Sequence, residues 1–355
     1  MKTMKTTNEL FNADRRAQRK HPKGRYYNIN SLLGNDWAMF YAICGSRKTG
    51  KSYALADFIC RQHQKYGENV KNYWMRISDT SIKALLLNKA QGLIDPDLQR
   101  KYNLDLTTKG MYVYNRGKPF CTVMPLSSFG KLKGVGFYDK DFTGYINIVL
   151  DEFQLEIGER RTSFDILYNF MGMVENIART TKTKLRIFLL GNTLEEASTI
   201  LKAFNFLPER FGRFYLKSKK CVIDNIEPTD EYLADREGSA SDILGGKGMS
   251  NYTNALTKDK SLITNERLRK PTAIIKFTKE PNNWYVVWDG KIIRRYNKEK
   301  IAKHLVIAMR PYLNEYYNPD SRKEIIDKYD ARYFKFRNLI DQSYFQGDLE
   351  LIRKL

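Results

Sequence analysis

Short apolar runs alternate with amphipathic stretches in the first two thirds of this 355-residue chain. Four runs rich in aromatic and β-branched residues are typical of buried strands: 37–44, 73–77, 145–150 and 185–190. Three stretches carry apolar residues at helical spacing: 52–65, 78–89 and 163–177. Two more strands, 110–114 and 119–124, flank a Gly-containing turn and predict a hairpin. Strands that alternate with helices predict an α/β domain with a mainly parallel sheet.

The pattern changes after residue 225, where clusters of Gly, Ser, Asp and Pro predict a linker. Beyond it, Asp289-Gly290 is a tight-hairpin signal between apolar runs. These strands are predicted at 273–277, 284–288 and 291–296, and a helix rich in basic and aromatic residues is predicted at 321–339. We therefore expect a small α+β second domain. The predicted divisions are a flexible basic arm (1–25), an α/β domain (26–210), a lid or linker (211–255) and a basic C-terminal domain (256–355).

The loop after the first strand fits the pattern G-x-x-x-x-G-K-[ST] without a gap. Its eight residues are Gly45, Ser46, Arg47, Lys48, Thr49, Gly50, Lys51 and Ser52. Backbone amides of such a loop cradle the β-phosphate, Lys51 reaches the β/γ oxygens, and the Ser52 hydroxyl holds Mg²⁺. The flanking strand and helix strengthen the prediction, since a helix N-terminus favours bound phosphate. The alternative interpretation is a Gly-rich surface turn.

A carboxylate pair follows another predicted strand, at Leu150-Asp151-Glu152. In a phosphate-loop site, Asp151 holds Mg²⁺ through its water shell, and Glu152 orients and deprotonates the attacking water. Such a base separates ATP hydrolysis from phosphorylation of a small acceptor. Surface Asp-Glu pairs are common, so this pair indicates a catalytic site only because the phosphate loop is also present. Together they predict an ATPase that uses ATP and Mg²⁺.

Several further polar residues are candidates for the same chemistry. Asn192 follows a buried strand, where an amide can sense the γ-phosphate, although a plain turn Asn fits too. Arg47 can neutralise γ-phosphate charge from its own subunit, and Arg179 is the candidate trans arginine finger. The alternatives to Arg179 as the finger are Lys182, Lys184 or Arg186. In the loop before the carboxylate strand, Lys131 and Lys133 are candidate contacts to DNA.

The net charge of the chain indicates which class of molecule it binds. With 61 basic and 40 acidic residues, the chain has a formal net charge of +21. The excess lies on the N-terminal arm and on both predicted domains, with +9 from residue 251 onward. A polyanion, most plainly nucleic acid, is the partner that such a field attracts; a merely soluble basic surface is the alternative. No apolar run reaches 18 residues, so no membrane partner is expected. The four cysteines lack metal-site spacing and are expected to be reduced thiols.

These residues resemble a known family. Five stretches carry the resemblance: the loop 45–52, the strand 72–77, and the segments 125–127, 149–153 and 204–208. They are similar to the genome-packaging ATPase of small tailed podophages, the phi29-like viruses, and more distantly to large terminase subunits. The resemblance implies an ASCE-type P-loop fold and a ring motor, usually a pentamer, docked at the portal of an empty capsid. It implies ATP-driven pumping of double-stranded DNA in the host-cell cytoplasm, with the motor absent from the mature virion.

In that family the second domain looks like an RNase H-type nuclease that has lost its active site. The strands predicted at 272–277 and 284–288 contain no Asp or Glu, whereas a two-metal nuclease needs three or four converging carboxylates. We therefore expect no nuclease activity. The resemblance also implies nucleic-acid binding by this domain, including a packaging RNA in some members, and the interleaved residues 333–337 fit that role. Two alternatives stay open: a nucleic-acid-binding ATPase that acts as a switch or recombination factor, and a P-loop kinase.

Overall fold

The computed structural model describes most of the chain as two compact units. The first unit draws on residues up to 204 and 208–256, and the second on 205–207 and residues from 257 onward. The described residues are 26–132, 141–153, 165–178, 184–191, 199–208, 211–240, 243, 260–278, 283–297, 313–315 and 319–353. Among them, no helix has the length and apolar content that a membrane crossing requires.

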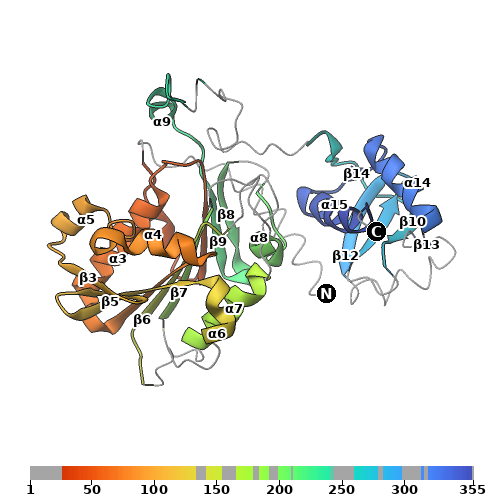
Figure 1. The fold of residues 1–355 in the computed structure, drawn as a ribbon. Helices are drawn as coiled ribbons and strands as arrows, with labels where there is room; N and C mark the ends of the chain where they lie inside the picture. The colour runs from red at the N-terminus through yellow and green to blue at the C-terminus, as the bar shows by residue number, and fades with distance from the viewer. Residues whose placement is uncertain are drawn as a thin grey trace. The chain divides into compact units, whose positions relative to one another are not determined.

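A nine-stranded sheet forms the centre of the first unit, in the order β3-β4-β5-β2-β6-β7-β1-β9-β8 (Figure 1). Its six inner strands are parallel: β5 (Lys118–Pro125), β2 (Val70–Arg76), β6 (Tyr145–Asp151), β7 (Lys184–Gly191), β1 (Phe40–Cys44) and β9 (Cys221–Asn225). Antiparallel strands close both edges: β3 (Leu106–Lys109), β4 (Tyr112–Asn115) and β8 (Gly212–Leu216). The prediction of an α/β domain with a mainly parallel sheet is confirmed.

Helices cover both faces of this sheet (Figure 1). On one face lie α3 (Lys51–Tyr66), α4 (Asp79–Ala90) and α5 (Pro96–Lys101), and on the other α6 (Phe129–Leu132), α7 (Ile166–Ile177) and α8 (Thr199–Ala203). The remaining short elements of this unit are α2 (Asn30–Leu33), α9 (Asp230–Ala234) and the 3₁₀ turns η1 (Gly67–Asn69), η2 (Leu126–Ser128) and η3 (Lys217–Lys219). Two covered faces explain why the parallel strands read as continuous apolar runs.

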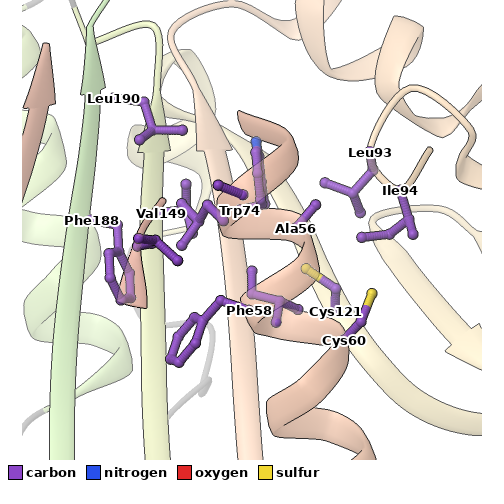
Figure 2. Close-up of a cluster of buried hydrophobic side chains, with 14 of the residues drawn as sticks. Ala56, Phe58, Cys60, Trp74, Leu93, Ile94, Cys121, Val149, Phe188 and Leu190 are labelled. Atoms are coloured by element: carbon purple, nitrogen blue, oxygen red, sulfur yellow. The ribbon is translucent and has the colours of Figure 1, made fainter. Parts of the chain in front are cut away.

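The core under α3 fixes the helix that follows the phosphate loop. Phe58 of α3 packs against Phe188 of β7, with ring centroids 5.5 Å apart. Figure 2 shows these rings with Trp74 of β2 and Val149 of β6 in one apolar cluster. Each fully buried side chain of this size contributes about 1.5–3 kcal/mol. This packing holds the start of α3 at the carboxyl edge of the sheet.

The first unit extends past the predicted boundary at residue 210. Strands β8 and β9 pair with each other, and β9 pairs with β1, so both belong to the first sheet. Asp224 of β9 is fully buried and accepts two hydrogen bonds from Arg213 of β8, at 2.5 and 2.7 Å. The Tyr27 hydroxyl donates to the same carboxylate at 2.7 Å. The apolar residues of these strands and this ion pair place 211–225 within the sheet and not in a linker.

In its described residues, the second unit forms a five-stranded sheet with two α-helices and one 3₁₀ turn, η4 (Lys260–Leu262). Its order is β13-β10-β11-β12-β14, with an antiparallel meander flanked by parallel outer strands. The strands are β10 (Pro271–Lys276), β11 (Asn283–Trp288), β12 (Ile292–Asn297), β13 (Leu313–Glu315) and β14 (Lys335–Phe336), and the helices are α14 (Pro319–Asp330) and α15 (Leu339–Arg353). Asp289 and Gly290 both have positive φ, as a tight turn requires. The three predicted strands and their hairpin are confirmed.

The single helix predicted at 321–339 is wrong. The structure ends α14 at Asp330, forms β14, and starts α15 at Leu339. Phe334 and Phe336 are buried on one side while Tyr333 is half exposed, which is the alternation of a strand. These two phenylalanines belong to the core with Phe345, so they are not free to stack on nucleic-acid bases.

Candidate active site

The predicted phosphate loop joins the carboxyl end of β1 to the start of α3. Gly50 precedes the helix with φ of 84°, a left-handed conformation that favours glycine. At Gly45 a Cβ would lie 3.1 Å from the Cβ of Ile226, so a side chain there would crowd the segment after β9. The sequence motif therefore has the strand–loop–helix setting on which the prediction depended.

Lys51 is buried in the loop itself. Its ammonium donates to the carbonyl oxygens of Gly45 at 2.9 Å and Ser46 at 2.7 Å, and lies 3.3 Å from Thr49 Oγ1. Burial lowers the pKa of Lys51 from 10.5 to about 8, because desolvation disfavours the charged form. The loop thus holds the buried Lys51 ammonium beside the N-terminus of α3.

Ser52 and Asp151 meet although they lie about 100 residues apart. The Ser52 hydroxyl donates to Asp151 Oδ1 at 3.5 Å. Asp151 is the last residue of β6 and is buried, and Glu152 follows it with φ of 58° and a half-exposed side chain. A hydroxyl and a carboxylate at this distance are the hard oxygen ligands that Mg²⁺ takes. The structure therefore brings together the predicted metal ligands and places Glu152 next to them.

Arg76 is a site residue that the sequence did not reveal. It ends β2, which neighbours β6, and donates to Asp151 Oδ2 through Nε at 3.1 Å and Nη2 at 2.8 Å. Its Nη1 also lies 3.6 Å from Glu152 Oε2. A charged residue ending an apolar strand was the only available signal, and the sequence does not say which strands are neighbours. Arg76 thus pairs with both carboxylates at the edge of the sheet.

Two tyrosines hold the backbone of the loop from outside. The backbone amide of Tyr27 donates to the Thr49 carbonyl at 2.8 Å, and the Tyr232 hydroxyl of α9 donates to the Arg47 carbonyl at 2.7 Å. Arg236 donates to the same Tyr232 hydroxyl at 2.8 Å. Segments far apart in the sequence therefore fix the shape of the loop, while the Arg47 side chain is exposed.

The other candidates are only partly described. Arg179, Asn192, Lys133 and Lys182 lie outside the described residues, and Lys131 is exposed on α6. Of the alternative fingers, Arg186 donates to Gln62 Oε1 at 2.7 Å and lies over two aromatic rings, those of Phe58 and Tyr145. These contacts occupy Arg186 within its own unit and disfavour it as a finger.

The residues present fit a nucleotide with Mg²⁺. Ser46 Oγ is buried in the loop and has no hydrogen-bond partner among the described residues. The loop also presents a buried ammonium, and the Ser52–Asp151 pair supplies oxygen ligands. By contrast, the described residues hold no cluster of three or more His, Cys, Asp or Glu that would bind a metal without a nucleotide. The four cysteines are free and buried.

The chain is similar to several known proteins. Residues 21–267 match the family of the podovirus DNA encapsidation protein (Gp16). The DNA packaging proteins of Bacillus phage PZA and Bacillus phage phi29 are each 24% identical over 195 residues. The match covers 54% of this chain and 54% of each relative, so the chain spans about half the length of the curated relatives it matches.

Solved structures share the fold. The bacteriophage Phi-29 viral genome packaging motor assembly aligns with a TM-score of 0.62 at 19% identity, over 93% of this chain and 99% of that chain. The Phi-28 gp11 DNA packaging motor aligns with a TM-score of 0.60 at 13% identity, over 93% and 98%. The resemblance seen in the motifs is confirmed: this chain belongs to the podovirus DNA encapsidation protein (Gp16) family.

Proposed function

We propose that this protein is an ATPase that drives double-stranded viral DNA into a preformed capsid. The observation that carries the proposal is the meeting of Ser52, Asp151 and Glu152 beside the phosphate loop. Family membership and the net charge of +21 support DNA as the partner. ATP bound with Mg²⁺ would supply the phosphoanhydride bond whose hydrolysis releases the energy for movement.

The chain's own residues divide the work of hydrolysis. With ATP bound, Lys51 would give its ammonium to the β/γ phosphate oxygens in place of the loop carbonyls, and Ser52, together with Asp151 through water, would hold the Mg²⁺. Glu152 accepts the proton of the attacking water. Arg76 pairs with both carboxylates and so competes with Mg²⁺ and the attacking water for the same oxygens until it shifts away. Arg47 and Arg179 are proposed to neutralise γ-phosphate charge in cis and in trans, and Asn192 to sense it.

A ring of subunits follows from a trans arginine finger. We propose a homo-oligomeric ring, a pentamer as in the family, docked at the portal in the host cytoplasm and absent from the mature virion. Lys131 and Lys133 are proposed to touch the DNA phosphates. A packaging RNA remains a proposed partner.

The second unit is proposed to be an RNase H-like domain without nuclease activity. Strands β10, β11 and β12 contain no acidic residue, and the described part of the chain has no cluster of three metal-binding side chains. Hydrolysis of a phosphodiester by two metals needs such a cluster. The remaining role is to bind nucleic acid through its basic surface.

Substitution of Glu152 tests the proposal. Glu152→Gln removes the base but keeps the size of the side chain, so we expect ATP binding to remain and turnover to fall at least 100-fold. Duplex DNA is expected to stimulate the wild type, which neither a kinase nor a slow switch would require. Glu175→Gln, an exposed position on α7, is the matched control and should hydrolyse ATP like the wild type. Normal turnover by Glu152→Gln would overturn the assignment of the base.

A further inference from the structure

A band of basic residues borders the sheet on the edge opposite the phosphate loop. Because the six inner strands are parallel, their amino ends share one edge and the phosphate loop lies at the other. We call the segments at the amino ends the amino-terminal rim, and they are 36–39, 65–71, 116–118, 141–145, 184–186 and 217–220. They hold nine basic and three acidic residues, a net charge of +6. The rim is therefore a positive edge separate from the nucleotide site.

Aromatic rings, more than carboxylates, hold the cations of the rim. The Nζ atom of Lys217 lies 4.2 Å from the ring centroid of Trp37, and that of Lys65 lies 5.1 Å from Tyr66. Lys184 lies 5.1 Å from the Tyr145 ring. Each contact of this kind holds the ammonium over the ring and leaves the positive charge in place. The rim thus presents fixed positive charges to solvent.

Other surface lysines pair with carboxylates, as Lys118 of the rim does with Glu68 at 3.5 Å. Lys83 pairs with Asp79 at 3.0 Å, and Lys328 pairs with Glu324 one turn away on α14. Within the described residues, no carboxylate lies within salt-bridge distance of Lys65, Lys217 or Lys219. Positive charge that no described carboxylate neutralises is available to an external anion.

The length of the rim selects a polymer over a small anion. Six neighbouring strands, β5, β2, β6, β7, β1 and β9, contribute to it. At about 4.8 Å between strands, their amino ends span about 24 Å. Duplex DNA carries about fourteen phosphates over that length. The rings face the lysines, so they are not the open stacking platforms that bind single strands.

We propose that the amino-terminal rim binds the sugar-phosphate backbone of duplex DNA, a second contact surface away from the nucleotide site. This inference rests on the proposed function, because it assumes that duplex DNA is the substrate. Contacts to phosphates carry no sequence information, which suits a protein that must hold every part of a genome.

Salt dependence of DNA binding tests the inference. The triple variant Lys65→Gln, Lys217→Gln and Lys219→Gln removes three rim charges, and the matched control Lys83→Gln, Lys89→Gln and Lys101→Gln removes three lysines of the same unit that pair with carboxylates. The logarithm of duplex affinity is measured against the logarithm of salt for the full chain. We expect the slope of the rim variant to fall by about 2.7, or about 0.9 for each phosphate that is no longer neutralised, and the control to keep the slope of the wild type. A Lys→Arg triple at the rim should keep it too.

The outcomes separate this inference from the proposed function. If the wild type binds duplex DNA with a steep salt slope and the rim variant keeps that slope, the rim proposal is overturned and the motor proposal stands. If the wild type shows no salt-dependent affinity for duplex DNA, the motor proposal itself fails. A loss confined to a structured RNA, with duplex binding unchanged, would also overturn the assignment to DNA. ATP affinity of the rim variant, measured in parallel, should equal that of the wild type because the phosphate loop lies at the other edge.

Discussion

Alkaline pH is expected to weaken ATP binding, because the loop lysine loses its charge within the usable pH range. In the folded chain, burial lowers the pKa of Lys51 from 10.5 to about 8. The ammonium, which attracts the phosphates, is therefore present below pH 8 and is lost above it. Bound ATP favours the charged form, so protonation and nucleotide binding are linked. Affinity should stay high up to about pH 7.5 and then decline.

The size of the effect follows from the fraction of charged lysine. With a pKa of about 8, roughly nine tenths of Lys51 is charged at pH 7 and roughly one tenth at pH 9. If only the charged form binds, the dissociation constant rises about tenfold across this range, equivalent to about 1.4 kcal/mol. The ordinary lysine pKa of 10.5 would give almost no change over the same range.

Titration with a fluorescent ATP analogue between pH 7 and pH 9 measures this constant. Lys51→Arg is the control, since a guanidinium stays charged throughout and should remove the pH dependence even if affinity is lower. Phosphate groups titrate near pH 6 and contribute little above pH 7. Equal wild-type affinity at pH 7 and pH 9, or the same decline in Lys51→Arg, would refute the reasoning.

Three further substitutions probe the site and its support. Arg76→Gln removes the cation that pairs with Asp151 and Glu152, so we expect tighter binding of Mg²⁺-ATP. We also expect that duplex DNA no longer stimulates the basal rate of ATP hydrolysis. Arg213→Ala leaves Asp224 buried without its cation and should lower the free energy of unfolding by about 3–5 kcal/mol in denaturant titrations. Gly144→Ala would place a Cβ 2.2 Å from the Asn69 carbonyl oxygen, so thermal unfolding should show a loss of about 1–3 kcal/mol.

A specific result would contradict each of these three predictions. Unchanged DNA stimulation in Arg76→Gln would show that its contacts with the carboxylates do not matter to turnover. A loss below about 1 kcal/mol in Arg213→Ala would mean that water reaches Asp224. Gly130→Ala, where a Cβ meets nothing within 4 Å, is the control for Gly144→Ala. Equal stability of the two alanine variants would contradict the steric argument.

The sequence predicted the parts of the site that are local in the chain. The phosphate loop and the carboxylate pair each lie at the end of a long apolar strand, and such strands give strong patterns. The contact between Ser52 and Asp151 could be predicted from the phosphate loop and the carboxylate pair alone. Arg76 was missed because its role depends on β2 lying next to β6, which no local pattern encodes.

Short and polar elements were harder to predict. The strand β14 has two residues, and its basic and aromatic neighbours fit a helix equally well, so the helix prediction ran through it. Strands β8 and β9 were assigned to a linker because the Gly- and Ser-rich segment that follows them dominated the pattern. Their place in the sheet depends on pairing of β9 with β1, about 180 residues away in the chain. Tyr232 was missed for the same reason, since its partner Arg47 is also distant in sequence.

Packaging of DNA into portal-bearing procapsids tests the central claim most directly. The measured quantity is the length of duplex DNA protected from added nuclease, with wild-type protein or Glu152→Gln, in the presence of ATP. We predict genome-length protection with the wild type and none above background with Glu152→Gln, although the variant still binds ATP. Equal protection by both proteins, or protection without ATP, would contradict a motor driven from the site formed by Lys51, Ser52, Asp151 and Glu152.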